Sequence, residues 1–256
     1  MENALPISLK RVLRHTVPWF YDQLWRFGPR NYPIVRAITR DGGWTVHSGP
    51  FVGMRFVRHS TGSSLPPKLL GAYERELHGF VERAVAARPS RVVDVGSAEG
   101  YYAVGFAMRL PGAQIHAFDT EPLARTLCRD LARLNGVEDR VYTHGLCTQQ
   151  NLAELAPALI ICDCEGCELE LLDPVRVPEL AACSLVVELH DFLDPRISRE
   201  ILTRFEPTHT IETVSSGPHR VQDYPELAGL TPELAELALE EARPGIMEWA
   251  YMIPRP

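Results

Sequence analysis

The chain has 256 residues and a net charge of −7, with 45% hydrophobic and 23% charged residues. This size and composition are ordinary for one soluble domain with an extension, and no apolar run approaches the ~20 residues that span a membrane. The N-terminus does not resemble a signal peptide. We therefore expect a cytoplasmic protein whose six cysteines are reduced thiols.

Charge is unevenly distributed along the chain. Residues 1–60 carry nine Lys or Arg and three Asp or Glu. The remaining residues carry seventeen Lys or Arg and thirty Asp or Glu. The acidic main part argues against a nucleic acid partner, because phosphate binding needs a basic surface. The basic part could contact an acidic partner or a membrane surface, but a solvated helix packed on its own domain is the preferred interpretation.

Residues 1–64 are predicted to form an accessory element in front of a main domain at 65–256. Apolar residues recur at helical spacing over 8–27, and the segments 44–47 and 54–57 predict a hairpin around Ser48-Gly49-Pro50. Glycine, serine and proline residues at 62–67 mark the border. A long helix is then expected from Lys68 to Arg88, ending before Pro89.

From residue 91 the pattern alternates between strands and helices. This alternation predicts a doubly wound, mostly parallel α/β sheet of seven strands, which is a Rossmann-like fold. Thr120 is expected to cap the helix at 122–135, and Asn135-Gly136 to end it. Strands are predicted at 91–95, 114–119, 140–144, 158–163, 184–190, 208–214 and 247–253, and helices near 99–110, 122–135, 149–155, 168–173, 195–205 and 231–242.

A long connection, residues 215–246, separates the last two predicted strands and is a candidate lid over a substrate site. Thr231-Pro232-Glu233 is expected to begin its helix. A solvated surface excursion is an equally good interpretation. Its polar and aromatic side chains include His219, Arg220, Asp223 and Tyr224.

A cofactor motif is visible where the strand at 91–95 runs through a glycine-containing turn into a helix. Gly96 would let the backbone turn and approach a ligand, and Gly100 would allow tight packing of the helix. The helix amides would then face the ligand with the positive end of the helix dipole. Asp119 ends the next strand, where its carboxylate could accept two hydrogen bonds from ribose hydroxyls.

The glycine spacing, Asp-x-Gly-x-x-x-Gly, differs from the Gly-x-Gly-x-x-Gly of dinucleotide folds. Ser97 lies between the glycines, and Glu99 is expected to repel a pyrophosphate. A cationic nucleoside without phosphate fits better, and the turn resembles the first motif of class I methyltransferases, which bind S-adenosyl-L-methionine. The resemblance implies that Asp119 is the ribose-binding acid, followed by Thr120. It also implies that Cys147 lies near the adenine, although a small core residue is an equally good interpretation.

Charged residues follow the next two apolar strands. Asp163 and Glu165 are expected on one side of an extended chain after the strand at 158–163, and Glu188 and His190 on one face of the strand at 184–190. If these strands are neighbours, several carboxylates and an imidazole converge beside the cofactor. Burying such groups is costly, which indicates a functional purpose.

Two of these segments resemble the FkbM family of methyltransferases. Asp163-Cys164-Glu165-Gly166-Cys167-Glu168 matches the Asp-x-Glu-Gly-x-Glu element of that family, and Val186-Val187-Glu188-Leu189-His190 is similar to its later strand motif. With the glycine turn, the likeness spans about residues 91–191, roughly two fifths of the chain. The resemblance implies methyl transfer, commonly to an oxygen of a sugar or secondary metabolite in natural product biosynthesis.

His190 is the candidate base for a hydroxyl nucleophile, because a histidine with the reference pKa of ~6.5 accepts a proton near neutrality. Asp163, Glu188 or Asp191 could orient it, and a structural histidine is the alternative.

A second hypothesis places Mg²⁺ or Mn²⁺ on Asp163, His190 and Asp191. Asp163, Glu165 and Asp191 are catalytic candidates together with His190. Asp163 is also a candidate for cofactor binding.

Several alternatives remain open. Cys162-x-Cys164-x-x-Cys167 could hold zinc or iron and sulfur, but core thiols are preferred, because alternation places Cys162 and Cys164 away from Asp163. Tyr73 and Glu74 could also reach the cofactor. A nicotinamide-dependent oxidoreductase lacks the phosphate-binding glycines, whereas a non-catalytic nucleotide-binding module of the same fold stays possible. We expect a small-molecule substrate, no stable membrane association, and consider a homodimer.

Overall fold

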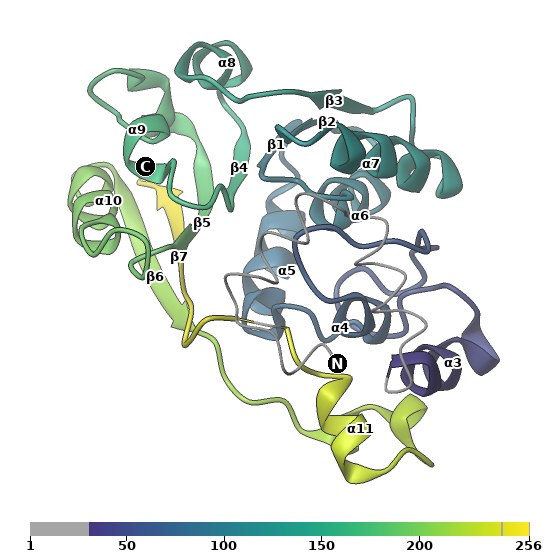
Figure 1. Ribbon diagram of the computed structural model, residues 1–256. Helices are drawn as coiled ribbons and strands as arrows, with labels where there is room; N and C mark the ends of the chain where they lie inside the picture. The colour runs from purple at the N-terminus through teal and green to yellow at the C-terminus, as the bar shows by residue number, and fades with distance from the viewer. Residues whose placement is uncertain (1–30, 242, 256) are drawn as a thin grey trace.

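The computed structural model describes residues 31–241 and 243–255. Its centre is a seven-stranded sheet with the order β3-β2-β1-β4-β5-β7-β6 (Figure 1). Neighbouring strands from β3 to β5 run parallel, and β7 is antiparallel to both β5 and β6. The strands are β1 (Arg91–Val95), β2 (Gln114–Phe118), β3 (Val141–His144), β4 (Leu159–Cys162), β5 (Ser184–Leu189), β6 (His209–Ser215) and β7 (Glu248–Pro254). The predicted fold class is confirmed.

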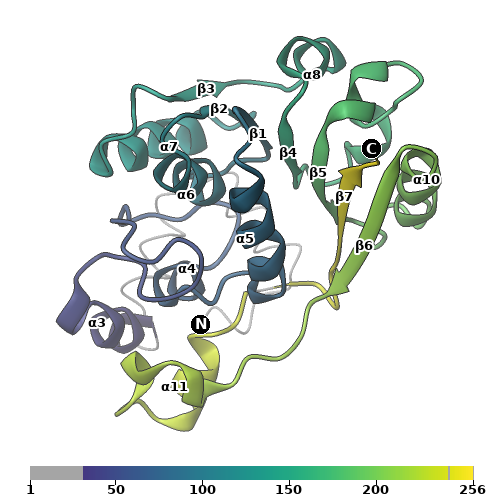
Figure 2. The same ribbon diagram turned by 180° about the vertical axis from the view of Figure 1, so that it is seen from behind.

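Helices cover both faces of the sheet, as Figures 1 and 2 show from opposite sides. Alternate residues of one strand belong to different cores, with Val92 packed on one face and Val93 and Val95 on the other. This is why the central strands are apolar throughout. One face carries α5 (His78–Ala87), α6 (Tyr101–Arg109) and α7 (Pro122–Leu134), and the other carries α8 (Gln149–Leu155), α9 (Glu168–Leu171), η3 (Pro178–Ala182) and α10 (Ile197–Phe205).

Helix α7 begins at Pro122, as predicted, but its N-terminal cap differs from the prediction. Its N-cap is Glu121, which makes no side-chain cap bond, so the expected cap by Thr120 is wrong. The helix ends at Leu134, immediately before Asn135-Gly136, as predicted. Its buried side chains are Ala124, Leu127, Cys128, Leu131 and Ala132, which recur at helical spacing on the side that faces the sheet.

The single long helix expected from Lys68 to Arg88 is instead broken into α4 (Leu65–Leu70), η2 (Arg75–Leu77) and α5. Gly71 ends α4 with φ +73°, and a Cβ at this position would lie 2.0 Å from the carbonyl oxygen of Ser48. A distant segment therefore occupies the path of the helix, and only glycine tolerates the contact. Glu74 adds a second left-handed residue before η2.

The described part of the N-terminal segment packs on the main core. Helix α3 (Asn31–Gly42) contributes Ile34 and Ile38 to the same core as the sheet. The predicted hairpin is reduced to one bridge, Thr45 to Arg55, with flanking backbone hydrogen bonds around a longer loop. The helix predicted over residues 8–27 lies outside the described residues.

The described part of the connection between β6 and β7 contains η4 (Val221–Asp223), η5 (Pro225–Leu227) and α11 (Pro232–Leu237). Thr231 caps α11, since its side chain accepts a hydrogen bond from the Leu234 amide, as predicted. Both η5 and α11 contact α3, so this connection packs beside the N-terminal helix (Figure 1). Within the described residues, helices are too short or too polar to cross a membrane.

Candidate active site

The glycine turn after β1 lies against the end of β4. Gly96 has φ +84°, and a Cβ there would lie 1.6 Å from the carbonyl oxygen of Asp163. Glycine is therefore required for β1 and β4 to end in contact, which brings the turn directly against Asp163. Ser97 is buried, and a Cβ on Gly100 would contact Cys128 of α7, in agreement with the tight helix packing expected there.

Asp119 follows β2 and is held by backbone amides. One carboxylate oxygen accepts from the Ala98 amide at 2.8 Å and the other from the Glu121 amide, also at 2.8 Å. Burial raises the pKa of Asp119, although these two hydrogen bonds oppose the change. Each oxygen keeps a second lone pair. The carboxylate can therefore accept ribose hydroxyls without releasing the turn.

Glu99 does not face the ligand side of the turn. It is fully buried and forms an ion pair with the buried Lys68 of α4. Ser60 and the Thr61 amide donate further hydrogen bonds to it, each at 2.9 Å. The expectation that Glu99 repels a pyrophosphate is therefore wrong, because its charge is neutralised inside the protein.

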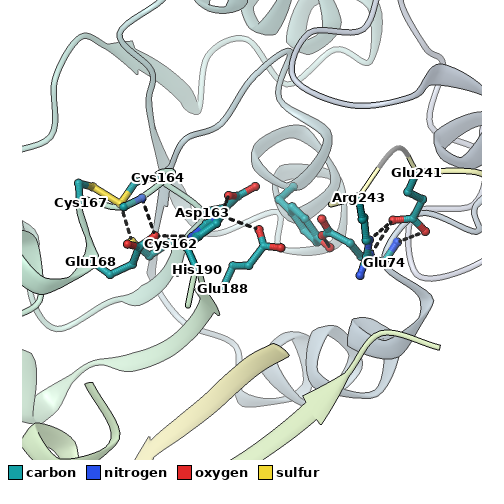
Figure 3. Close-up of polar contacts among 12 residues, drawn as sticks. Glu74, Cys162, Asp163, Cys164, Cys167, Glu168, Glu188, His190, Glu241 and Arg243 are labelled. Carbon is teal, nitrogen blue, oxygen red and sulfur yellow. Dashed lines mark hydrogen bonds and ion pairs between the residues drawn. A yellow bond between two sulfur atoms is a disulfide. The ribbon is translucent and has the colours of Figure 1, made fainter. Parts of the chain in front are cut away.

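Asp163, Glu188 and His190 meet where the neighbouring strands β4 and β5 end (Figure 3). Nε2 of His190 lies 3.4 Å from Asp163 Oδ1 and 3.4 Å from Glu188 Oε2. One ligand-capable atom from each residue lies within 4.8 Å of the others. We call these three residues the histidine cluster. The expected convergence of the two strand ends is observed.

Glu168 completes the surroundings of His190 and was not among the predicted site residues. It is fully buried at the start of α9, and its Oε1 lies 2.6 Å from His190 Nδ1. Its Oε2 is buried without a hydrogen-bond partner among the described residues. The sequence signal was present, because Glu168 is the last acid of the Asp-x-Glu-Gly-x-Glu element. The alternation of side chains along a strand could not predict the direction of the Glu168 side chain, because Glu168 comes after the turn that follows β4.

The cluster has perturbed protonation equilibria. Burial lowers the pKa of His190, but the hydrogen bonds to Asp163 and Glu168 outweigh this effect and raise that pKa to about 10. Burial, followed by the charge of Asp163, raises the pKa of Glu188 to about 11. At neutral pH each of the two side chains therefore holds a proton. The ordinary histidine pKa used in the sequence argument does not apply to this arrangement.

Glu74 points toward the histidine cluster from the segment between α4 and η2 (Figure 3), and Tyr73 directly precedes it in the sequence. Glu74 is buried and accepts a hydrogen bond from the Tyr102 hydroxyl. Burial, then the charges of Asp163 and Glu241, raise the pKa of Glu74 to about 8. Burial and the charges of Glu74 and Asp163 also raise the pKa of Tyr73. Both side chains therefore share the electrostatic environment of Asp163.

Other predicted residues lie apart from the cluster. Strand β4 ends at Cys162, and Glu165 lies in an exposed turn with φ +56°, so it does not share a face with Asp163 as expected. Asp191 is exposed and accepts a hydrogen bond from the Ser198 amide at 2.8 Å. Thr120 is exposed beside Asp119, and Cys147 is buried in the core after β3.

The cysteines also differ from expectation. Cys164 and Cys167 form a disulfide, so the prediction of six reduced thiols is wrong for this pair. The four other cysteines are buried and free. Cys162 lies with its Sγ 3.7 Å from Cys164 Sγ, which confirms that these two side chains share one side of the chain.

A cavity of about 490 Å³ lies beside the candidate lid, lined in part by Glu76, His219 and Arg243. Its wall is linked to the site by a hydrogen bond at Glu74, and ion pairs of Arg243 support this link (Figure 3). Glu241 Oε1 accepts from the Glu74 amide at 3.2 Å, and Arg243 pairs with both Glu76 and Glu241. The candidate lid thus contacts the segment that faces the histidine cluster.

Comparisons with known proteins support the architecture. No family model and no curated protein matches the sequence. Cofactor-bound Rv0187 from MTB superposes with a TM-score of 0.50 at 14% identity, over 97% of each chain. A Klebsiella pneumoniae protein provisionally assigned as an O-methyltransferase gives 0.51 at 12% identity, over 96% of each chain. An O-methyltransferase from Bacillus cereus in complex with SAH gives 0.48 at 8% identity, over 95% of this chain and 96% of the other.

The first two similarities extend over nearly the whole chain. They therefore include the seven-stranded sheet with its antiparallel β7 and the helices on both faces. The glycine turn and Asp119 lie at the carboxyl edge of this sheet, where ligands bind in doubly wound folds. The chain therefore has the Rossmann-like fold of the class I S-adenosylmethionine-dependent methyltransferases.

Proposed function

We propose that this chain is an S-adenosylmethionine-dependent methyltransferase that modifies a hydroxyl oxygen of a small molecule, such as a sugar or a secondary metabolite. The observation that carries the proposal is the placement of Asp119 and the Gly96 turn at the same sheet edge as the histidine cluster. The FkbM-like element from Asp163 to Glu168 supports oxygen as the methylated atom. The similar Klebsiella pneumoniae structure is described as an O-methyltransferase, which agrees with this choice.

The residues at this edge suit a cationic nucleoside. Asp119 would accept the ribose hydroxyls, and the side of the turn near Cys147 would receive the adenine. Asp163 would attract the positive sulfonium and ammonium groups, since opposite charges stabilise one another in a partly buried site. Glu74, whose pKa is raised to about 8, would lose its proton more readily when a positive group binds nearby. When bound, S-adenosylmethionine supplies a methyl group on a positively charged sulfur. The acidic lining, rather than Glu99, disfavours a diphosphate.

His190 remains the candidate base on an electrostatic argument. The hydroxyl of the acceptor has to lose its proton as its oxygen attacks the methyl group. With a positive sulfonium nearby, His190 would hold its own proton less tightly, because like charges repel. Asp163 and Glu168 contact opposite ring nitrogens and keep the imidazole oriented. The site therefore offers a base whose protonation responds to the cofactor.

A metal-assisted reaction is the second candidate, and one observation favours it. Nδ1 of His190 contacts Glu168, which leaves Nε2 facing Asp163 and Glu188. Histidines that bind metals usually donate their other ring N–H to a carboxylate in this way. The ligands would be Asp163, Glu188 and His190, with Glu188 in place of Asp191. A bound Mg²⁺ or Mn²⁺ would orient the acceptor oxygen and lower the pKa of its hydroxyl.

Calorimetry with S-adenosylhomocysteine tests the cofactor assignment. Asp119→Ala should weaken binding by about 1–3 kcal/mol, because charge-assisted hydrogen bonds to the ribose are lost. Asp130→Ala is a matched control, since Asp130 is an exposed acid of α7 that forms a local ion pair with Arg133. Equal affinities for wild type and Asp119→Ala would reject the ribose role. Failure of S-adenosylhomocysteine to bind the wild type would reject the function.

Titration with MnCl₂ separates the two versions of the chemistry. Glu188→Gln should abolish saturable Mn²⁺ binding if the cluster is a metal site, whereas Asp191→Asn should leave it intact. Absence of saturable binding to the wild-type protein would reject the metal-assisted version. Transfer of radiolabel from S-adenosylmethionine to a hydroxyl-bearing acceptor, with and without a chelator, then reports the requirement in turnover.

A further inference from the structure

A disulfide joins two cysteines that lie, in sequence, between two acids in contact with His190, and Figure 3 shows this bond beside Glu168. Cys164 directly follows Asp163, and Cys167 directly precedes Glu168. Asp163 contacts Nε2 of the imidazole and Glu168 contacts Nδ1. The bond between the two sulfur atoms therefore limits how far these carboxylates can move apart.

The short loop inside the disulfide has an unusual backbone. Glu165 has φ +56° and Gly166 has φ +105°, so two successive residues adopt left-handed conformations. This region is unfavourable for a residue with a side chain, such as Glu165. The Gly166 amide donates to Glu168 Oε1 at 3.3 Å, and the same oxygen contacts His190. The conformation that the cross-link retains is thus part of the histidine environment.

The disulfide is placed where a reductant can reach it. Glu165 and Gly166 are exposed, and both half-cystines are only partly buried. Behind them, the fully buried Cys162 has its thiol 3.7 Å from Cys164 Sγ, in a geometry that donates an S–H hydrogen bond. Its burial keeps Cys162 from reacting with a reductant in solvent, and its position lets it donate to the sulfur of Cys164.

We propose that Cys164 and Cys167 form a reversible redox modification site, through which a dithiol reductant controls the assembly of the histidine cluster. A thiolate of the reductant attacks Cys167 Sγ, and Cys164 leaves as a thiolate that receives the Cys162 hydrogen bond. The second thiol of the reductant then breaks the mixed disulfide and releases Cys167. After protonation from solvent, two electrons and two protons have passed from the dithiol to the protein, and the reductant is left as a disulfide.

Reduction frees the loop from its left-handed conformation, so the Gly166 amide and Glu168 are no longer held against His190. The oxidised protein has the assembled cluster, and the reduced protein has a displaced one. The consequence for turnover rests on the proposed methyltransferase function. The coupling between the disulfide and His190 does not depend on it.

The test uses dithiothreitol as the dithiol and the ring ¹⁵N signals of His190 as the readout. Alkylation and mass spectrometry count the thiols before and after treatment. In oxidised wild-type protein we expect a slowly exchanging Nδ1–H signal, which full reduction shifts or removes. Cys164→Ser/Cys167→Ser should give the reduced spectrum with or without dithiothreitol. Cys183→Ser, which removes another buried free thiol, should respond as the wild type does.

An unchanged His190 spectrum after complete reduction would overturn the proposal, as would a double variant with the oxidised spectrum. Calorimetry with S-adenosylhomocysteine is run on both redox states. If the nucleoside binds neither state while His190 still responds, the methyltransferase function fails and the redox coupling stands.

The role of Cys162 has its own matched pair of variants. Cys162→Ala should slow reduction by dithiothreitol by roughly tenfold, because the leaving thiolate loses a hydrogen bond, whereas Cys162→Ser retains a donor and should keep the rate. Equal rates for the alanine variant and the wild type would overturn the assignment of Cys164 as the leaving group.

Discussion

At the level of single residues, the charge state of His190 determines what the site can do. Two carboxylates lie on opposite sides of the ring, at 2.6 Å from Nδ1 and 3.4 Å from Nε2. The local sequence would give an ordinary histidine that is neutral at pH 8. The partners instead stabilise the imidazolium, so His190 becomes a base only when another positive charge enters the site.

This environment makes stability depend on pH. The folded pKa of His190, about 10, lies above its ordinary value, so the stabilisation is fully present below the unfolded pKa of ~6.5. It is lost as pH rises through the folded pKa. We expect urea unfolding to show a steeper fall in stability between pH 7 and 10 for the wild type than for His190→Gln. If the free energy of unfolding fell with pH equally in the two proteins, His190 would not be an imidazolium in the folded protein.

Histidine ring NMR gives an independent check. His190 should remain protonated at pH 8, whereas burial lowers the pKa of His209, which contacts the Cys183 carbonyl at 2.8 Å. His209 therefore serves as the internal control for a neutral ring. A neutral His190 signal at pH 8 in ligand-free protein would show that the carboxylates do not hold the proton.

At the level of secondary-structure elements, α4 is joined to the turn after β1 by Lys68 and Glu99. Both side chains are at most 2% exposed. Lys68→Met should reduce the free energy of unfolding by about 3–5 kcal/mol, because Glu99 is left charged and unpaired inside the protein. Arg83→Met is the control, since its pair with Glu212 is exposed and should contribute at most about 1 kcal/mol.

Urea unfolding measures both changes. Lys68→Met/Glu99→Gln should recover part of the lost stability, because the uncompensated charge is gone. A loss as small as that of Arg83→Met would mean that the buried pair does not hold α4 against the turn.

The contact between β1 and β4 depends on one backbone position. Gly96→Ala combines a left-handed φ with a clash against the Asp163 carbonyl, whereas Gly53→Ala has φ +85° and open space around it. The control should lose about 1 kcal/mol of stability through strain alone. Gly96→Ala should lose more, and it should also weaken S-adenosylhomocysteine binding, because the turn and Asp163 are forced apart. Equal losses in the two variants would show that the close approach is not required.

At the level of the whole molecule, the candidate lid is held by charges on segments far apart in sequence. Arg243 is 17% exposed and pairs with Glu76 of η2 and with Glu241. Arg243→Met removes the guanidinium that pairs with both acids, and Glu241 keeps its contact with His219. Hydrogen exchange should therefore become faster over residues 216–246, while the central strands keep their protection.

Arg220→Met is the control for this experiment, because the Arg220 pair with Asp223 is exposed. Exchange over the same residues should be close to that of the wild type in this variant. Unchanged exchange in Arg243→Met would mean that apolar packing against α3, rather than the ion pairs, holds the connection in place.

The strands were predictable from the sequence to within one or two residues, because a buried strand is a local apolar run. The broken helix at 68–88 was not, since the interruption at Gly71 reflects a contact with Ser48. Glu165 was misplaced for a similar reason, because the turn after β4 replaces the extended chain. The disulfide was also missed, since sequence spacing does not report the distance between two sulfur atoms.

The positions of the strands along the chain, the glycine turn, Asp119 and the acids after β4 and β5 follow from local pattern, because periodicity and turn residues act over a few positions. Tertiary structure alone decided which of these groups carry charge and which face the site. It paired Glu99 with Lys68, placed Glu168 on His190, and left Asp191 outside the cluster. Burial and the distance between charges arise only when segments far apart in the chain are packed together, and these two quantities determine the chemistry.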